Sequence, residues 1–378
     1  FLCRIDEPRV SAQRCIELLI NNPVERAEDI NLPSIQINDL VASRTVRRTV
    51  RNPGTPQTYV AEVNAPDGVR VTVEPDTLIM GNDDTAEYTV EFEGDGSTLN
   101  EWLFGDITWT SAAHRVFTPF SAILTYFEVL QDAFGSGATG SAQIPLQFGY
   151  DGDYVLRTSG LRRPCVLPDN VLDDTLCTNS FMATVGQDDD QIYEFELPAP
   201  TDRNAGVRRF TRIVGNDRLH VRVALFDELT DGYEPGALTA DDLDIYLFYC
   251  GPDADAACNL ATAEFVGGSA NIDTSDEQID VEFPRPGKYL IDVHGYRTVG
   301  SEAKFRLYFW EIGTQADSGN LAVSGAPSSA TNGTRVNLNA GWSDLEKGLW
   351  LGGISHSDDG TSTIDYTLIE VSNEPFGN

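Results

Sequence analysis

Between residues 31 and 123, apolar side chains recur at every second position in a series of short runs. Three of these runs are Tyr59, Ala61 and Val63, then Val69, Val71 and Val73, then Tyr88, Val90 and Phe92. Turn-forming sequences rich in Gly, Pro, Asn and Asp separate the runs, at 52–56, 65–68, 74–76, 81–84 and 94–96. A period of two is typical of strands that bury one face. Short strands with turns at this spacing predict a β-sandwich of the immunoglobulin-like type.

The same pattern continues over the rest of the chain. A second set of alternating runs starts near Ile192 and includes HVRVALFD, DIYLFY, YLIDVHGY and FRLYFWEI, and the chain from Asn320 adds three or four strands. The RPGKY sequence at 285–289 indicates a hairpin turn. One stretch near 11–22 has helical periodicity, and Pro23 ends it. The sequence therefore predicts an all-β fold of consecutive β-sandwich domains.

The predicted domain boundaries follow the shifts in this pattern. We expect a linker or remnant at 1–30, a sandwich at 31–123, a strand-rich connector at 124–164, a second sandwich at 165–313 and a small β domain at 318–378. The connector is weakly similar in sequence to the last segment. The two could pair into one sandwich around an inserted middle domain, or they could simply share a strand-rich composition.

The six cysteines fall into couples that are close in sequence: Cys3 with Cys15, Cys165 with Cys177, and Cys250 with Cys258. Such spacing is expected of disulfides formed in an oxidising compartment, although six cysteines allow fifteen connectivities. The chain contains no C-x2-C pair and four scattered histidines, which argues against zinc. The cysteines therefore predict a secreted protein with three local disulfides.

The charge is strongly acidic, with 26 Lys and Arg against 59 Asp and Glu and a formal net charge of −33. A field of this sign repels nucleic acid and anionic lipid head groups, so neither is an expected partner. No run of about 18 apolar residues is present that would predict a membrane span. The chain starts without Met or a basic-then-apolar leader, which suggests a fragment of a longer exported precursor.

An aspartate-rich run, DELTDGYEPGALTADD, separates two alternating patterns at 227–242. The cluster on one strand end, one loop and the next strand start contains Asp227, Asp231, Asp241, Asp242 and Asp244. Of these, we expect Asp227, Asp231, Asp242 and Asp244 to be the ligands. Ca²⁺ requires six to eight oxygen ligands, and carboxylates brought together without a cation raise one another's pKa. The sequence predicts a calcium site here, with a plain solvated acidic loop as the alternative.

Catalytic candidates are few. His294-Gly295 and Gly360-Thr361-Ser362 superficially resemble the histidine and serine motifs of subtilisin-like proteases, but the first continues as HGYR and the second as GTSTIDY on a predicted hairpin. The helix dipole and oxyanion geometry of that serine motif would be absent. We therefore assign no catalytic or cofactor-binding residue. Exposed tryptophans among Trp102, Trp109, Trp342 and Trp350 could stack on carbohydrate, although Trp109 alternates with Ile107 as a core residue would.

A family resemblance emerges from several motifs in order. They are NLPSI at 31–35, the T-V-x-R-T-V-x-N-x-G hairpin from Thr45 to Gly54, APDGVRVTVEP at 65–75, and G-x-I-T-W-T-x-x-x-H-x-V from Gly105 to Val116. This stretch resembles the fibronectin-III-like domain that follows the catalytic domain in secreted subtilisin-like proteases of the cucumisin-like group. Phe1 to Cys3 with Cys15 resembles the end of the protease domain. The downstream segments resemble further C-terminal β domains, the middle one similar to a jelly-roll-like bacterial pre-peptidase C-terminal (PPC) domain.

The resemblance implies a non-catalytic C-terminal region of a secreted subtilisin-like serine endopeptidase. The catalytic Asp, His and Ser motifs of that family have no counterpart in this chain, so no catalytic residue carries over and the chain itself is not expected to be an enzyme. The implied role is to stabilise the catalytic domain of the same precursor, and to bind protein substrate or a surface. The alternative is a self-associating subunit of an extracellular filament or surface layer, in which edge strands pair between copies.

Overall fold

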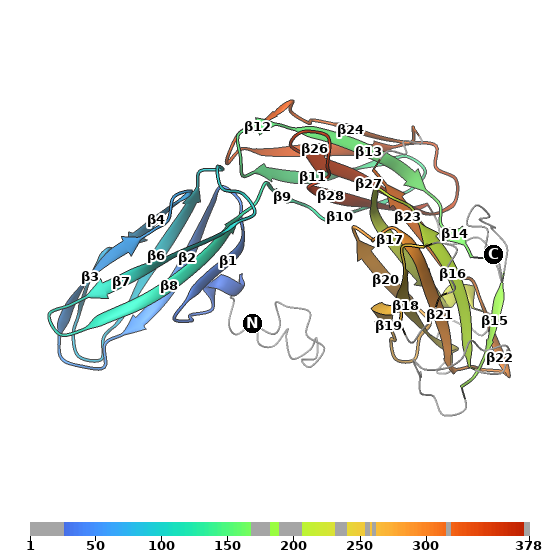
Figure 1. Ribbon diagram of the computed structural model, residues 1–378, viewed down its shortest axis with the longest axis horizontal. Helices are drawn as coiled ribbons and strands as arrows, with labels where there is room; N and C mark the ends of the chain where they lie inside the picture. The colour runs from blue at the N-terminus through green and yellow to red at the C-terminus, as the bar shows by residue number, and fades with distance from the viewer. Residues whose placement is uncertain are drawn as a thin grey trace.

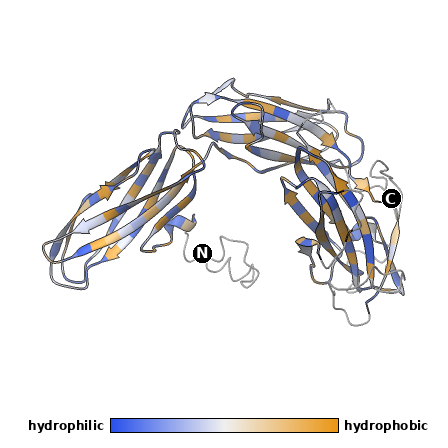
Figure 2. Cartoon of the chain, viewed as in Figure 1, coloured by the Kyte–Doolittle hydropathy of each residue, from blue (hydrophilic) through white to orange (hydrophobic). Residues whose placement is uncertain are grey.

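The computed structural model describes residues 26–167, 182–188, 206–230, 240–253, 258, 262–314 and 319–373. Apart from two short 3₁₀ turns, η1 (Ala27–Asp29) and η2 (Asp227–Leu229), the regular elements in these ranges are β-strands. They form three packed β-sandwich units, arranged in a row with the second unit between the first and the third (Figure 1). Hydrophobic and hydrophilic residues alternate along many of the strands (Figure 2), as strands with one buried face require. The predicted all-β fold is therefore confirmed.

The first sandwich packs a five-stranded sheet, in the order β1-β8-β7-β3-β5, against a three-stranded sheet, in the order β2-β6-β4. Its strands are β1 (Ile35–Leu40), β2 (Ser43–Arg51), β3 (Gln57–Asn64), β4 (Val69–Glu74), β5 (Thr77–Met80), β6 (Thr85–Gly94), β7 (Trp102–Thr110) and β8 (Arg115–Leu124). Val46, Val90 and Ile107 are fully buried between the two sheets. The period-two pattern therefore marks the core face correctly in this unit.

Two polar side chains of the hairpin motif from Thr45 to Gly54, Arg48 and Asn52, hold neighbouring segments of the first sandwich together. Buried Arg48 donates to the backbone carbonyls of Leu32 (3.1 Å), Ser34 (3.0 Å) and Glu28 (2.7 Å), and so fastens the entry segment to β2. Asn52 donates to the carbonyl of Thr55 at 3.0 Å, which closes the turn after β2, and to the carbonyl of Gly81 at 2.9 Å, in the turn between β5 and β6. The carbonyls that accept these bonds belong to residues outside the β-strands, and the bonds satisfy them.

The second sandwich is built from two segments of the chain that are far apart in sequence. Its strands are β9 (Phe127–Val129), β10 (Asp132–Ser136), β11 (Gly140–Phe148), β12 (Gly152–Asp153), β13 (Val155–Arg162), β24 (Leu321–Ser324), β25 (Ser329–Ala330), β26 (Arg335–Trp342), β27 (Gly348–Ser357) and β28 (Asp365–Asn373). The two main sheets have the orders β10-β28-β27-β13 and β24-β26-β11-β9, so green early strands lie beside red late strands in Figure 1. Strand β10 pairs with β28 in parallel, whereas β11 pairs with β26 antiparallel.

The third sandwich is inserted between β13 and β24 of the second. Its strands are β14 (Cys165–Val166), β15 (Ala183–Gly186), β16 (Val207–Val214), β17 (Arg218–Leu225), β18 (Asp242–Gly251), β19 (Glu264–Ser269), β20 (Glu277–Glu282), β21 (Gly287–Arg297), β22 (Glu302–Phe305) and β23 (Tyr308–Gly313). The sheets β14-β23-β17-β20 and β16-β21-β18-β19 enclose a core that includes Val223, Leu247 and Ile291.

A separate apolar cluster joins the third sandwich to the second. It contains buried Leu219, Trp310 and Ile312 from the third unit, and Leu351 and Leu368 from the second. Apolar area that is removed from water between two units stabilises their contact. This cluster therefore holds the inserted sandwich against the outer face of the sheet that contains β27 and β28.

Candidate functional site

Three of the aspartates that were predicted to bind calcium are described: Asp227 in η2, and Asp242 and Asp244 in β18. Each of the three is bound by a different group. Asp227 accepts a hydrogen bond from the Thr274 hydroxyl at 2.6 Å, and Asp242 accepts one from the Asp273 backbone N–H at 3.1 Å. Asp244 lies 3.0 Å from Nδ1 of His294. In the described part of this region, the carboxylates therefore hold a neighbouring loop and a buried histidine in place.

Calcium binding through this loop stays a prediction. Asp231 lies outside the described residues. Within the part of the chain that the structure does describe, no group of three or more His, Cys, Asp or Glu side chains is placed to hold a metal ion. Asp241 is also engaged, because its carboxylate accepts a hydrogen bond from the Val299 backbone N–H at 2.7 Å.

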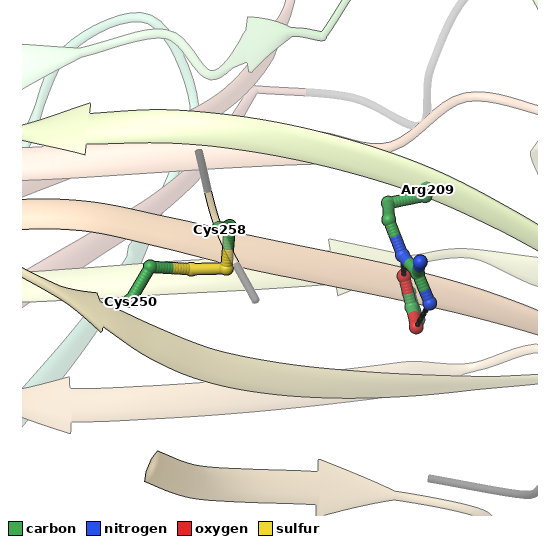
Figure 3. The surroundings of a disulfide bond; sticks show 4 residues. Arg209, Cys250 and Cys258 are labelled. Carbon is green, nitrogen blue, oxygen red and sulfur yellow. Dashed lines mark hydrogen bonds and ion pairs between the residues drawn. A yellow bond between two sulfur atoms is a disulfide. The ribbon is translucent and has the colours of Figure 1, made fainter. Parts of the chain in front are cut away.

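The structure describes both cysteines of one predicted disulfide. Cys250 and Cys258 are joined, with their Cα atoms 5.1 Å apart, and Figure 3 shows this bond with Arg209 of β16 in the same view. Cys165 is also disulfide-bonded. Its expected partner Cys177, like Cys3 and Cys15, lies outside the described residues, so these two pairings stay predictions.

A buried cluster of ionisable groups surrounds Asp244. His294 is 1% exposed and lies between Asp244 and Asp188, with both nitrogen-to-oxygen distances at 3.0 Å. Burial lowers the pKa of His294, but the two carboxylates outweigh it and the net shift is upward. Burial, reinforced by Asp244 and Asp242, raises the pKa of nearby Glu277 to about 7. The cluster is a structural network inside the third sandwich.

The two motifs that superficially resemble protease motifs lie in different sandwiches. Each ring nitrogen of His294 faces a carboxylate, of Asp244 at Nδ1 and of Asp188 at Nε2. Ser362 is exposed in the turn between β27 and β28, where Asp359 accepts a hydrogen bond from the backbone N–H of Thr361 at 2.7 Å. A serine nucleophile needs a base within hydrogen-bond reach, and within the described ranges the hydrogen bond of Ser362 is made by its backbone N–H to Asp359 at 3.4 Å.

A second ionic network, which the sequence did not indicate, crosses the interface between the second and third sandwiches. His220 donates to Asp280 at 2.6 Å through Nε2, and its Nδ1 lies 2.9 Å from the hydroxyl of Tyr366. Arg222 bridges Asp280 at 2.7 Å and Glu370 at 2.5 Å. Burial alone would raise the pKa of Asp280, but the bonds from His220 and Arg222 outweigh it and lower the pKa to about 2. The network fixes the orientation of the two units.

The tryptophans separate into core and surface residues. Trp109 and Trp342 are each 4% exposed and belong to the cores of the first and second sandwiches. Trp102 is 45% exposed and stacks on Phe104, which is 67% exposed, with the ring centroids 6.1 Å apart. An exposed aromatic pair on the outer side of β7 is a surface on which another molecule could pack.

The described residues also enclose an interdomain cleft of about 310 Å³ beside the apolar interface cluster. The second sandwich lines it with β13, the end of β27 and the turn at 360–363. The third sandwich lines it with residues 217–219, Phe283 and Thr314. No sequence pattern pointed to this cleft, because its two walls belong to segments that are far apart in the chain.

Comparisons with known proteins support the resemblance over part of the chain. Residues 29–122 match the fibronectin type-III domain family. The subtilisin-like protease SBT3.3 of Arabidopsis thaliana is 37% identical over 103 residues, which are 27% of this chain and 13% of that protein. The subtilisin-like protease SBT5.3 of the same plant is 31% identical over 125 residues, which are 32% of this chain and 16% of that protein. This chain thus spans less than a fifth of these relatives' length.

Among solved structures, the secreted serine protease VesC from Vibrio cholerae is 9% identical and covers 75% of this chain and 50% of its own, with a TM-score of 0.21. A TM-score this low supports no conclusion.

The first sandwich is thus a fibronectin-III-like domain, as predicted from its motifs. Over about a third of the chain, the resemblance to the C-terminal region of subtilisin-like proteases is confirmed. Within the described ranges, no helix has the length and apolar character that a membrane span requires.

Proposed function

We propose that this chain is a non-catalytic accessory region of a secreted subtilisin-like serine endopeptidase. The observation that carries the proposal is the fibronectin-III-like sandwich, whose sequence relatives are subtilisin-like proteases. The Cys250–Cys258 disulfide supports secretion, because such bonds persist in oxidising compartments. In this proposal, the partner is the catalytic domain of the same precursor, and the PPC-like third sandwich contributes binding to substrate or to a surface.

The interface between the second and third sandwiches supports a stabilising role. The apolar cluster around Leu219 and Trp310, together with the Arg222–Glu370 ion pair, joins these two units. An apolar interface of this kind restricts the relative motion of the two domains that share it. The exposed Trp102–Phe104 pair on the first sandwich is the surface that we assign to packing against the catalytic domain.

Two measurements test this proposal. The purified full chain is expected to show no hydrolysis of casein and no labelling by a serine-directed fluorophosphonate. Casein hydrolysis that the fluorophosphonate abolishes would overturn the non-catalytic assignment. For the stabilising role, the precursor is produced with and without this chain, and the melting temperature of its catalytic domain is compared. Equal melting temperatures would contradict the stabilising role.

A second candidate function, a self-assembling extracellular subunit, is favoured by one observation. The outer face of the five-stranded sheet in the first sandwich exposes Trp102 (45%), Phe104 (67%) and Phe117 (58%), and such a face can also pack against a second copy. Size-exclusion chromatography and negative-stain imaging separate the two candidates. A soluble particle supports the accessory region, whereas a polymer supports the structural subunit.

A further inference from the structure

The cleft between the second and third sandwiches has the size and position of a small-molecule site. Its volume is about 310 Å³, at the lower end of the range of about 300–1,000 Å³ that is typical of ligand pockets. Such pockets occur preferentially where two domains meet. Leu219 belongs both to the cleft lining and to the apolar cluster that joins the two units, so the cleft continues an established interface.

Both walls of the cleft are held by hydrogen bonds within their own unit. In the second sandwich, the Ser357 hydroxyl accepts a bond from the Gly360 backbone N–H at 2.8 Å, and Asp359 accepts one from the Thr361 hydroxyl at 2.6 Å. In the third sandwich, Glu311 pairs with Arg218 and accepts the Gly215 backbone N–H at 3.0 Å. A ligand that enters would therefore meet preorganised walls, which lowers the cost of binding.

Each wall presents one charged group that is not committed to a partner. Arg157 on β13 is exposed, and among the described residues its guanidinium makes no recorded hydrogen bond or ion pair. Asp217, in the turn between β16 and β17, is also exposed, and its carboxylate is equally uncommitted within the described ranges. The cleft thus offers a set of N–H donors on one side and carboxylate acceptors on the other.

The remaining lining combines an apolar surface with hydroxyl groups. Phe283 is 46% exposed, and its ring is fixed edge-to-face on Tyr366 with the centroids 5.1 Å apart. Val155 adds a second apolar side chain to the lining. Hydroxyl groups come from Ser355, Ser357, Thr361, Ser362, Thr363 and Thr314. A ligand that fits needs one apolar face and several groups that both donate and accept hydrogen bonds.

We propose that this cleft binds a neutral saccharide, with one hexopyranose ring as the unit that it holds. The apolar C–H face of the ring packs on Phe283, and its hydroxyl groups accept from Arg157 and donate to Asp217. This inference is independent of the proposed function, because it depends only on the two walls and applies whether or not the chain is part of a protease.

Charge decides between a neutral and an acidic sugar. The chain carries a formal net charge of −33, Asp217 lines the cleft, and Asp359 accepts a hydrogen bond from the hydroxyl of the lining residue Thr361. A carboxylate-bearing ligand would gain one partner in Arg157 but would meet repulsion from these groups and from the whole chain. A neutral ring uses both the donor and the acceptor without this cost.

Saturation-transfer NMR on the full chain tests the proposal. The probes are D-glucose, D-galactose, D-mannose and N-acetyl-D-glucosamine, each up to about 10 mM, a range that detects weak binding of a single ring. Glucuronate and the dipeptide Gly-Leu serve as charged and peptidic comparisons. We expect saturation transfer to at least one neutral hexose. Its absence for all four, or transfer only to glucuronate or only to Gly-Leu, would overturn the proposal.

Three variants place the binding in the cleft. Arg157→Gln removes the donor, and we expect affinity to fall about tenfold or more, as is typical when a hydrogen bond to a charged group is lost. Asp217→Asn removes the charge of the acceptor, and Asn tolerates the positive φ of +56° at this position. The matched control is Arg162→Gln, because Arg162 is exposed on the same strand but does not line the cleft.

The pattern across the variants decides the outcome. We expect Arg157→Gln and Asp217→Asn to weaken hexose binding and Arg162→Gln to leave it unchanged, with circular dichroism unaltered in all three. Wild-type affinity in both cleft variants would show that the hexose binds elsewhere and would overturn the assignment. If Arg157→Gln fails to fold, Asp217→Asn alone still decides the question, since it keeps the size and backbone preference of the native residue.

Discussion

A buried histidine in the second sandwich makes this unit sensitive to acid. His356 lies in β27 with 0% exposure. Thr367 donates its hydroxyl to the Leu130 carbonyl at 2.7 Å, so its oxygen must accept the N–H at Nε2 of His356, 3.2 Å away. Nδ1 is then unprotonated and accepts from the Tyr154 hydroxyl at 2.7 Å. This neutral tautomer satisfies both ring nitrogens. A second proton, on Nδ1, would force the Tyr154 oxygen to accept, and the O–H of Tyr154 would lose the acceptor that Nδ1 provides.

The size of the effect follows from the shift in pKa. Burial lowers the pKa of His356 from its ordinary value of 6.5 to about 4. Because the folded pKa is the lower one, the unfolded chain binds the proton first as the pH falls, and stability is lost between pH 6.5 and pH 4. The free energy of unfolding should fall by about 2 kcal/mol between pH 7.5 and pH 5, and by about 3 kcal/mol in total below pH 4.

A variant isolates this contribution from the other titrating groups. The wild-type chain and His356→Gln are unfolded with urea at pH 7.5, 6.5 and 5, and the difference between their unfolding free energies is taken at each pH. The loss of the ring shifts this difference by a constant amount, whereas the proton linkage makes it pH-dependent. We expect the wild type to lose about 2 kcal/mol relative to the variant by pH 5. A difference that stays constant within about 0.5 kcal/mol would refute the reasoning.

Four further predictions concern the interface and the third sandwich. Glu370→Gln should lower the unfolding free energy by about 1 kcal/mol in urea titrations, because the residue is partly exposed; no change would mean that its ion pair contributes nothing. Replacing Cys250 and Cys258 with Ser should cost about 2.5 kcal/mol in calorimetry, as the chain-entropy estimate gives for so short a loop, and an unaltered melting temperature would contradict it. If the aspartate-rich loop binds calcium, millimolar Ca²⁺ should raise the melting temperature above that in EGTA or Mg²⁺, and Asp242→Asn should remove the rise; coinciding curves would leave a solvated acidic loop. Glu277 has a pKa raised to about 7, so its contribution is present at pH 5 and is lost as the pH rises through 7; melting temperatures should show the wild type losing stability relative to Glu277→Gln over this range, and parallel pH profiles would contradict the assignment.

In the first sandwich, the local sequence pattern predicts the strands and their buried faces. The alternation in VRVTVE at Val69–Glu74 predicts a strand, and the structure buries Val69 and Val73 in the core. The sequence also identifies Arg48 and Asn52 as members of a motif, but it does not show which groups their side chains bind. Their targets are backbone carbonyls up to 29 positions away, and such contacts depend on how the strands assemble.

In the second sandwich, which is built from two distant segments, the local sequence pattern does not predict which strands pair. The sequence left two explanations open for the similarity between 124–164 and 318–378. The structure pairs Asp132–Ser136 with Leu368–Ser372 in parallel, across more than two hundred residues. The period-two pattern of a strand specifies which face is buried, but not which distant edge it joins, because the partner and register are selected by the whole packed assembly.

In the candidate sites, too, the sequence identifies residues whose partners only the structure shows. The sequence predicted that Asp227, Asp242 and Asp244 act as calcium ligands, which stays a prediction. In the structure, Asp227 and Asp242 bind the 273–274 segment, and Asp244 binds a buried histidine. Their partners, such as His294, come from other strands.

The sequence by itself determined the all-β fold, the strand faces, the acidic charge and the fibronectin-III-like first unit, because these depend on local periodicity, composition and motif. Only the tertiary structure decided the network of His220, Asp280, Arg222 and Glu370 and the cleft between Arg157 and Asp217. Those features arise where two independently patterned units come into contact, and no local pattern encodes that contact.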